Sequence, residues 1–320
     1  MTSGSARPVP AQVPVVPGID MPPGVGVIVR DWLNANHVLL AGRDEVVLVD
    51  AGHVSCAATT LELVAARLAG RALDRLLLTH CHSDHMGGCA AIRRTFGTSI
   101  AVPADEAPLI RAWDSTALWL EHAGQRAERF EFDAVVHAGD RMCMADLEWE
   151  ALAVPGHDMG ALAFWCADEG ILISGDALWE RSFGIVLPGD GHALRLAAAR
   201  DTLLRLRSLG ARVVIPGHGA PFRDADAAIA ACLSRVAAFE QDERRLARHV
   251  LKVMFVFLLL ERGSLAQDEA RGLFATVPLF VDYDDRYFRL GPQTLAGALM
   301  EELAAAGAIF RNASGRVQAA

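Results

Sequence analysis

The chain has 320 residues, 52% of them hydrophobic, so it can bury one large core or two ordinary ones. Its formal net charge of −9 does not supply the basic surface that nucleic-acid binding requires. Six scattered cysteines without a CxxC pair, and an N-terminal segment that lacks the apolar run of a secretory signal, predict a reduced protein of the cytoplasm.

Strands and helices alternate through the first part of the chain. Residues 1–24 contain six prolines and predict a flexible lead-in. Predicted strands then occupy 25–32, 37–42, 45–52, 75–79 and 99–104. Predicted helices occupy 56–69 and 89–97, and residues 104–132 are expected to be mostly helical. This alternation indicates an α/β layered fold.

A second run of strands follows, and its antiparallel patterning predicts a second sheet. The expected strands are 134–139, 147–156, 161–168 and 170–177. A helix over 193–209 and a strand over 212–217 complete this part of the chain.

The character of the sequence changes after residue 222. We expect helices over 225–262, 263–274 and 292–307, and a small hairpin over 308–318. The apolar run at 253–260 is too short to span a bilayer, so it predicts a buried helical segment. Helices followed by a hairpin resemble a winged-helix module. We therefore divide the chain into a lead-in (1–24), an α/β domain (25–222) and a mainly helical, winged-helix-like domain (223–320).

Metal-capable side chains follow the strand at 75–79, in the stretch LLLTHCHSDHMGG. Alternate residues of a strand face the same side, so His80 and His82 can reach one ion together. Asp84 and His85 fall on the following turn and suit a second ion, whereas Cys81 points away from the ligands toward the core. Imidazole and carboxylate are ligands of zinc and similar ions. One segment cannot complete a coordination shell, so other loops must contribute.

Three further metal-capable residues stand at predicted strand ends. His157 lies in AVPGHDMG, Asp176 in LISGDAL and His218 in VVIPGHGAP. Loops gather at one edge of a sheet, and α/β sites usually form there. A carboxylate such as that of Asp176 can bridge two ions about 3.5–4 Å apart.

The ordered set HxHxDH, His after Pro-Gly, Gly-Asp and PGHG resembles the metallo-β-lactamase superfamily over residues 25–222, with VDAG at Asp50. The resemblance implies an αββα sandwich with a dinuclear metal site at one edge of the two sheets, holding two Zn²⁺ per chain, or Fe or Mn. It assigns one ion to His80, His82 and His157, the second to Asp84, His85 and His218, and the bridge to Asp176. Asp50 is expected behind the ligands, where a carboxylate fixes their orientation.

The activity that this resemblance implies is that of a zinc-dependent metallo-hydrolase. A hydroxide that bridges the two ions would attack an ester, thioester or lactone bond, with Asp84 as the catalytic proton shuttle. Glyoxalase-II-like thioesterases and lactonases are the favoured relatives. Two alternatives remain open, a mono-iron persulfide dioxygenase and an RNA-cleaving phosphodiesterase of the same superfamily.

The C-terminal part argues against a nucleic-acid partner. Winged helices often bind DNA through the third helix, but the helix at 292–307 carries two Glu and no Lys or Arg. Residues 264–320 hold five basic and seven acidic residues, which is unfavourable for phosphate binding. We therefore expect a small-molecule acyl substrate, no membrane partner, and a C-terminal module that caps the pocket and packs the chain or forms a homodimer.

An apolar acyl pocket is predicted near the ligands. Its expected residues are Met159, Trp179 and Phe183, with Trp113 and Trp119 on the helical insertion as a lid. The two tyrosines of the chain, Tyr283 and Tyr287, either line this pocket with Arg286 or form a buried aromatic cluster. The basic motif by which glyoxalase-II enzymes hold glutathione is not clearly present, so the sequence does not predict glutathione specificity.

Overall fold

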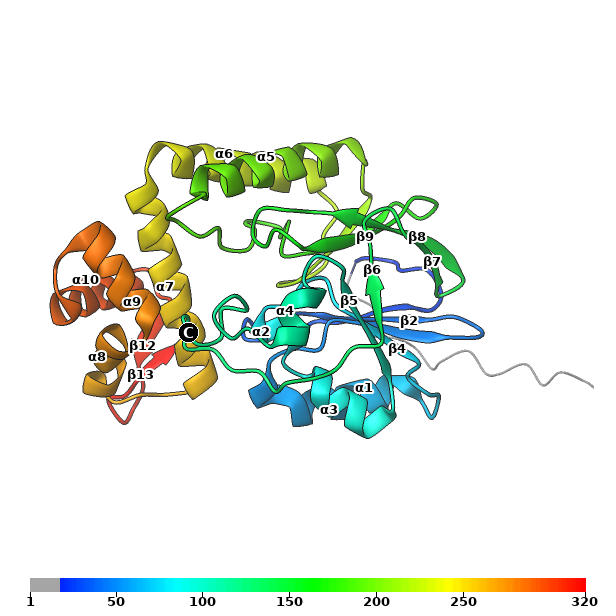
Figure 1. Cartoon of the computed structure of the whole chain (residues 1–320), viewed down its shortest axis with the longest axis horizontal. Helices are drawn as coiled ribbons and strands as arrows, with labels where there is room; N and C mark the ends of the chain where they lie inside the picture. Colours follow the sequence, from blue (N-terminus) through cyan, green and yellow to red (C-terminus); the bar gives the residue numbers. More distant parts are fainter. Residues whose placement is uncertain (1–17) are drawn as a thin grey trace, which may run out of the picture.

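The structure is a computed structural model that describes residues 18–320. Two β-sheets packed face to face form its centre (Figure 1). Most of the predicted lead-in, residues 1–17, lies outside the described residues. The first sheet has the strand order β1 (Val25–Ile28), β2 (His37–Ala41), β3 (Val46–Val49), β4 (Arg75–Leu77), β5 (Ser99–Pro103) and β6 (Ala134–Val136). Its first three strands are antiparallel, and β3 to β6 run parallel.

The second sheet has the order β11 (Val213–Pro216), β10 (Ile171–Gly175), β9 (Leu162–Cys166), β8 (Leu147–Ala153) and β7 (Arg141–Met144). Only β10 and β11 are parallel; the other neighbours are antiparallel. Side chains of both inner faces share one core, in which Leu40 and Val47 of the first sheet meet Trp149 and Phe164 of the second.

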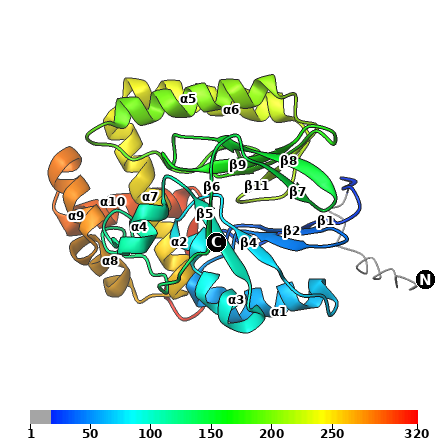
Figure 2. The same ribbon diagram turned by 45° about the vertical axis from the view of Figure 1, so that its right-hand side comes forward.

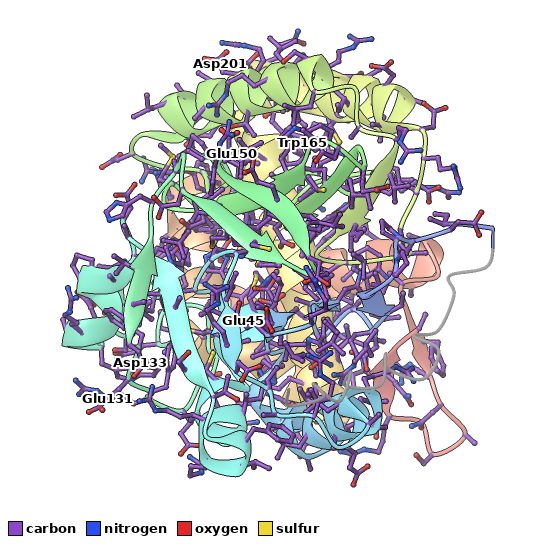
Figure 3. The ribbon with its side chains drawn as sticks, turned by 90° about the vertical axis from the view of Figure 1, so that its right-hand side faces the viewer. Glu45, Glu131, Asp133, Glu150, Trp165 and Asp201 are labelled. Carbon is purple, nitrogen blue, oxygen red and sulfur yellow. The ribbon has the colours of Figure 1, made fainter. Side chains whose placement is uncertain are left out.

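Helices cover both outer faces, because alternate residues of each strand point outward. Leu39 and Leu48 pack under α1 (Ala57–Leu68) and α3 (Cys89–Phe96), while their neighbours face the other sheet. On the opposite side, α5 (His192–Ser208) and α6 (Ala225–Gln241) cover the second sheet, from which Trp165 points toward them (Figure 3). The layers therefore run helix, sheet, sheet, helix, which confirms the predicted αββα sandwich.

The C-terminal helices lie at one side of the sandwich (Figures 1 and 2). They are α7 (Glu243–Arg262), α8 (Gln267–Thr276), α9 (Pro278–Tyr283), a π-helix (Asp284–Phe288) and α10 (Pro292–Ala305), followed by a hairpin of β12 (Ile309–Arg311) and β13 (Val317–Ala319). The predicted helical region with a terminal hairpin is present. Among the described residues, none of the helices has the length and apolar character needed to cross a membrane.

The predicted helix over 225–262 is two helices. Asp242 has an extended backbone, with φ −146° and ψ 93°, and its side chain accepts the N–H of Arg245. This contact caps the start of α7 and lets α7 leave α6 in a new direction.

The predicted helical insertion at 104–132 contains one short helix, α4 (Ala107–Ala112). Trp113 has a left-handed backbone, with φ 53°, which ends α4. Asp114 then accepts the N–H groups of Thr116 and Ala117, so turns replace the expected helix.

The strand predicted at 134–139 belongs to the first sheet, and its predicted place in the second sheet is wrong. Its residues form β6, which pairs in parallel with β5 of the first sheet. The carboxylate of Asp133 accepts the N–H of Ile100 and the guanidinium of Arg93, and these contacts hold the start of β6 at that edge. The strand β7, which the sequence did not predict, takes the expected place in the second sheet.

Candidate metal centre

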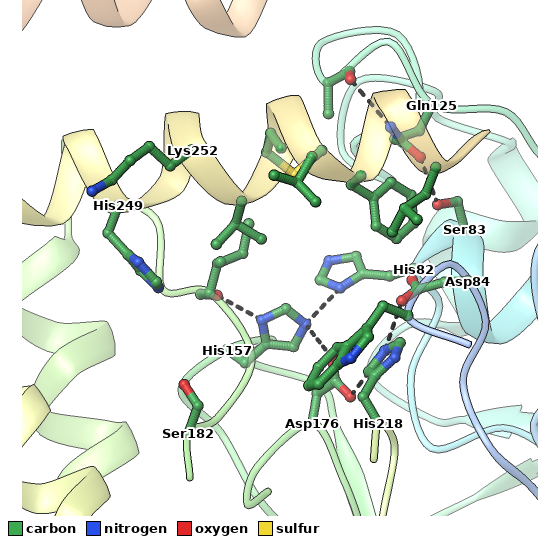
Figure 4. Close-up of a pocket in the computed structure, with 18 of the residues that line it drawn as sticks. His82, Ser83, Asp84, Gln125, His157, Asp176, Ser182, His218, His249 and Lys252 are labelled. Atoms are coloured by element: carbon green, nitrogen blue, oxygen red, sulfur yellow. Dashed lines mark hydrogen bonds and ion pairs between the residues drawn. The ribbon is translucent and has the colours of Figure 1, made fainter. Parts of the chain in front are cut away.

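Seven His and Asp side chains converge where the loops after β4, β8, β10 and β11 meet. Figure 4 shows five of them, His82, Asp84, His157, Asp176 and His218. They form two groups, and within each group the possible ligand atoms lie within 4.8 Å of one another. The first group is His80, His82 and His157; the second is Asp84, His85, Asp176 and His218. The structure thus brings together all seven ligands that the sequence predicted.

Backbone conformation places the ligands of the first motif. Strand β4 ends at Leu77, earlier than predicted, so His80 and His82 stand on an extended loop. The short helix α2 (Ser83–Met86) then turns Asp84 and His85 toward the second group. Gly88 follows, where an added Cβ would lie 2.2 Å from the carbonyl oxygen of Ala51. A glycine is therefore required for this loop to pack against β3 and its following turn.

The first group consists of three imidazoles whose nitrogen atoms lie close together. Nδ1 of His82 lies 2.8 Å from Nε2 of His157, and Nδ1 of His157 donates to the carbonyl of Ile185. Nε2 of His80 is buried without a hydrogen-bond partner. Burial, followed by the neighbouring His157, lowers the pKa of His82 to about 4, and burial with three histidine neighbours puts the pKa of His80 well below its ordinary value. The nitrogen lone pairs are thus available to a cation.

The second group combines carboxylates with imidazoles. Nε2 of His218 lies 3.0 Å from Oδ2 of Asp84, and Nε2 of His85 lies 3.3 Å from Oδ1 of Asp176. Oδ2 of Asp176 lies 3.5 Å from Nε2 of His157, so this carboxylate contacts both groups. Burial alone would raise the pKa of Asp84, but His85 and His218 lower it to about 2. Asp84 is therefore ionised at neutral pH.

Asp50 supports the ligands from behind. Its two carboxylate oxygens accept the backbone N–H of Thr79 at 2.9 Å, the hydroxyl of Thr79 at 2.9 Å and Nδ1 of His85 at 2.8 Å. Its backbone φ of 62° is unusual for a non-glycine residue. Such backbone conformations cluster at functional sites. Because Nδ1 of His85 donates to Asp50, Nε2 is the ring nitrogen that faces the second group.

The two groups fit divalent transition-metal ions. Burial disfavours a charged His85, yet the carboxylates of Asp50, Asp176 and Asp84 hold the pKa of His85 well above its ordinary value. The surroundings therefore favour positive charge. The Nε2 atoms of His80 and His85 are buried without hydrogen-bond partners, and ligation of a metal ion in place of a proton would satisfy both. Nitrogen and carboxylate donors suit zinc, iron and manganese.

Residues 30–218, more than half of the chain, match the family model of the Metallo-beta-lactamase superfamily. The chain belongs to this superfamily. The hydroxyacylglutathione hydrolase of Xanthomonas euvesicatoria pv. vesicatoria is 31% identical over 182 residues, which are 56% of this chain and 58% of that relative. The protein of the same name from Rhodospirillum rubrum is 29% identical over 157 residues, 49% of this chain and 52% of that relative. The chain thus spans only about half the length of these curated relatives.

Solved structures show the same fold over nearly the whole chain. A metallo-beta-lactamase family protein from Thermus thermophilus has a TM-score of 0.54 and 24% identity, covering 93% of this chain and 99% of that one. A beta-lactamase domain protein from Burkholderia ambifaria has a TM-score of 0.56 and 20% identity, covering 94% of each. Because so much of the chain is covered, most of the C-terminal region of this metallo-β-lactamase superfamily member is part of the shared fold.

A cavity of about 470 Å³ opens onto the metal centre of this metallo-β-lactamase fold. The predicted pocket residues Trp179 and Phe183 line it, as does Trp119. Trp113 lies elsewhere, because its ring packs edge-on against Phe130 in the core under the first sheet. Met159 is 47% exposed and does not line the cavity.

The two tyrosines also lie outside the cavity lining. Tyr283 is buried among the C-terminal helices and packs edge-on against Tyr287. The hydroxyl of Tyr287 donates to Glu243 at 2.6 Å, and Arg286 pairs with Asp190. These residues fasten the C-terminal helices to the 189–190 loop, so of the two predicted roles the aromatic cluster is the observed one.

Several residues of the site were not recognised from the sequence in these roles. Nε1 of Trp179 donates to Oδ1 of Asp176 at 3.1 Å, so this tryptophan also orients the shared carboxylate. The ring of Trp32 stacks on His218, with centroids 5.6 Å apart. An added Cβ at Gly217 would lie 2.2 Å from Oδ1 of Asp176, which explains the glycine before His218. The PGHG pattern could have indicated that Gly217 is required before His218. No local sequence pattern indicates that Trp32 lies at the site.

Proposed function

We propose that this protein is a dinuclear-metal hydrolase that cleaves an ester-type acyl bond, a thioester, ester or lactone. The observation that carries the proposal is the pair of ligand groups that share the carboxylate of Asp176. The similarity to proteins named hydroxyacylglutathione hydrolase supports a thioester or a related acyl bond. Zinc is the proposed metal, with iron or manganese as alternatives.

When bound, the two cations would supply a Lewis acid for the substrate carbonyl and a water that ionises near neutral pH. The protein's own residues prepare the site for this chemistry. Asp84 is ionised and lines the cavity, so its carboxylate can accept a proton from the attacking water. His85 is fixed by Asp50, and Asp176 is fixed by Trp179.

The domain division at residues 222 and 223 remains a proposal. Helix α6 packs on α5 of the sandwich, whereas α7 lines the cavity. We therefore propose that the C-terminal region, 223–320, contributes to the site by capping it. A homodimer through these helices stays a prediction.

Metal analysis combined with a hydrolase screen tests the proposal. We expect two ions per chain and turnover within a panel of thioesters, lactones, esters and phosphodiesters. His82→Ala and Asp176→Ala should reduce turnover to background while the protein stays folded. The matched control is His137→Ala, since His137 is exposed and does not line the cavity.

Three outcomes would redirect the assignment. Retained turnover in either ligand variant would contradict it. One iron per chain with oxygen consumption would favour the persulfide dioxygenase. Cleavage of phosphodiesters alone would favour the nuclease branch.

A further inference from the structure

Helix α7 is apolar on two faces, one buried in the core and the other half-buried at the cavity. Its buried stripe includes Leu251, Phe255 and Leu258. A second stripe, which we call the α7 wall, consists of Val253, Val256, Phe257 and Leu260. These four are half-buried, and their i, i+3, i+4, i+7 spacing places them on one side of the helix. The α7 wall faces the cavity.

Helix α7, which carries His249 and Lys252, crosses above the labelled His and Asp side chains in Figure 4, and the α7 wall lines the same cavity. The floor of the cavity is made by His82, Asp84, His157, Asp176 and His218. Two loops contribute further apolar side chains to the walls: Leu118, Trp119 and Ala123, and Phe183, Ile185 and Leu187. A volume of about 470 Å³ is in the range of small-molecule sites. An apolar chain attached to a carbonyl on the floor would therefore be surrounded by apolar side chains.

The charged side chains that line the cavity do not favour binding of glutathione. Lys252 is the only Lys or Arg among the described residues that line it, and its ammonium lies 3.5 Å from the carboxylate of Glu302. Glu302 also pairs with Arg248. Burial, followed by Arg235 and Lys252, lowers the pKa of His249 to about 4, so this lining histidine is neutral. Glutathione carries two carboxylates, and the lining has no uncommitted cation to pair with them.

We propose that the substrate carries an apolar acyl chain, which the α7 wall buries, rather than a glutathione group. This inference rests on the proposed hydrolase function and names its substrate class. The C-terminal region then acts as the specificity-determining part of the site, because α7 belongs to it.

The kinetic test uses N-acetylcysteamine thioesters with acyl chains from two to twelve carbons, together with S-lactoylglutathione. Burying one methylene contributes about 0.8 kcal/mol, which corresponds to about a fourfold rise in kcat/KM. We expect kcat/KM to rise by about this factor per methylene until the cavity is filled. A flat or falling profile, or a preference for S-lactoylglutathione, would overturn the substrate class while leaving the hydrolase function in place.

A binding measurement separates the two proposals. The probes are non-hydrolysable S-alkyl thioethers of N-acetylcysteamine with four or twelve carbons, followed by quenching of tryptophan fluorescence, since Trp119 and Trp179 line the cavity. Tighter binding of the longer probe without turnover of any thioester, ester or lactone would support the apolar site and overturn the hydrolase function. Equal binding of both probes would overturn the apolar site.

Substitutions at Val256 locate the effect on the α7 wall. Val256→Trp fills the cavity and should lower kcat/KM for the dodecanoyl thioester about tenfold or more relative to the butyryl thioester. Val256→Ala enlarges the cavity, suits a helix, and should move the optimum to longer chains. The matched control is Leu194→Trp on α5, because Leu194 is 67% exposed and outside the cavity. Unchanged profiles in both Val256 variants would contradict the inference.

Discussion

Replacing Asp50 by Asn tests how strongly the residue behind the ligands controls the metal centre. The carboxylate of Asp50 makes three buried hydrogen bonds, two to Thr79 and one to Nδ1 of His85. Asparagine can keep the bond to the N–H of Thr79, and it tolerates the backbone φ of 62°. Its amide group replaces the oxygen that accepts from His85, so a donor would face a donor. The fold should therefore survive while the orientation of His85 is lost.

The expected magnitude follows from that single contact. A hydrogen bond to a charged group contributes about 1.5–3 kcal/mol, and loss of such a partner typically lowers metal affinity about 10–100-fold. We expect Asp50→Asn to weaken binding of one of the two ions by about this factor. The assay is competition between protein and a chromophoric chelator, with circular dichroism to verify folding.

A matched substitution provides the control for Asp50→Asn. Asp140→Asn makes the same chemical change in a turn, where the side chain accepts the N–H of His137 away from the site. The reasoning is refuted if Asp50→Asn binds both ions within about twofold of the wild type.

Three further predictions concern the metal centre, a glycine and a buried histidine. Trp179→Phe removes the donor to Asp176, a bond of about 0.5–1.5 kcal/mol, and should weaken metal retention up to about tenfold in the same competition assay; unchanged retention would contradict this role. Gly88→Ala should destabilise the fold by about 1–3 kcal/mol in urea unfolding, because its Cβ meets the carbonyl of Ala51, whereas Gly272→Ala in α8, with open space around it, should stabilise by about 0.4–1 kcal/mol. Burial, followed by Arg30, lowers the pKa of His37 from 6.5 to about 3. As the pH falls, His37 is protonated in the unfolded chain before it is protonated in the folded protein. The contribution of His37 to the free energy of unfolding is therefore fully present above pH 6.5 and is lost as the pH falls toward 3, by at most about 1.4 kcal/mol per pH unit. His37→Gln should show a shallower loss of unfolding free energy over that range, and an equal slope would contradict the assignment.

The metal centre was predictable because its residues carry local signals. His80, His82, Asp84 and His85 lie within six positions, and His157, Asp176 and His218 each follow an apolar strand. Strand ends meet at a common edge once the sheets form, so ordered motifs determine which side chains meet. The alternation of predicted strands with predicted helices also indicated a layered α/β fold, and the family resemblance supplied the order of the layers.

Contacts between segments far apart in the chain decided the rest. The pairing of β6 with β5 depends on Asp133 reaching Ile100, and the turn at Asp242 sets the direction of α7. Met159 and Trp113 were expected near the pocket because of their position in the sequence, but side-chain direction is set by packing partners.

The sequence by itself thus determined the superfamily, the layered fold and the set of metal-capable residues, since periodicity and motif spacing are local properties. Only the tertiary structure decided how the cavity is lined. The apolar run at 253–260 was predicted to be simply buried, and its composition cannot distinguish a packed face from one that lines a cavity. That distinction arises because one side of α7 faces the cavity above the metal centre, while the other side packs in the core.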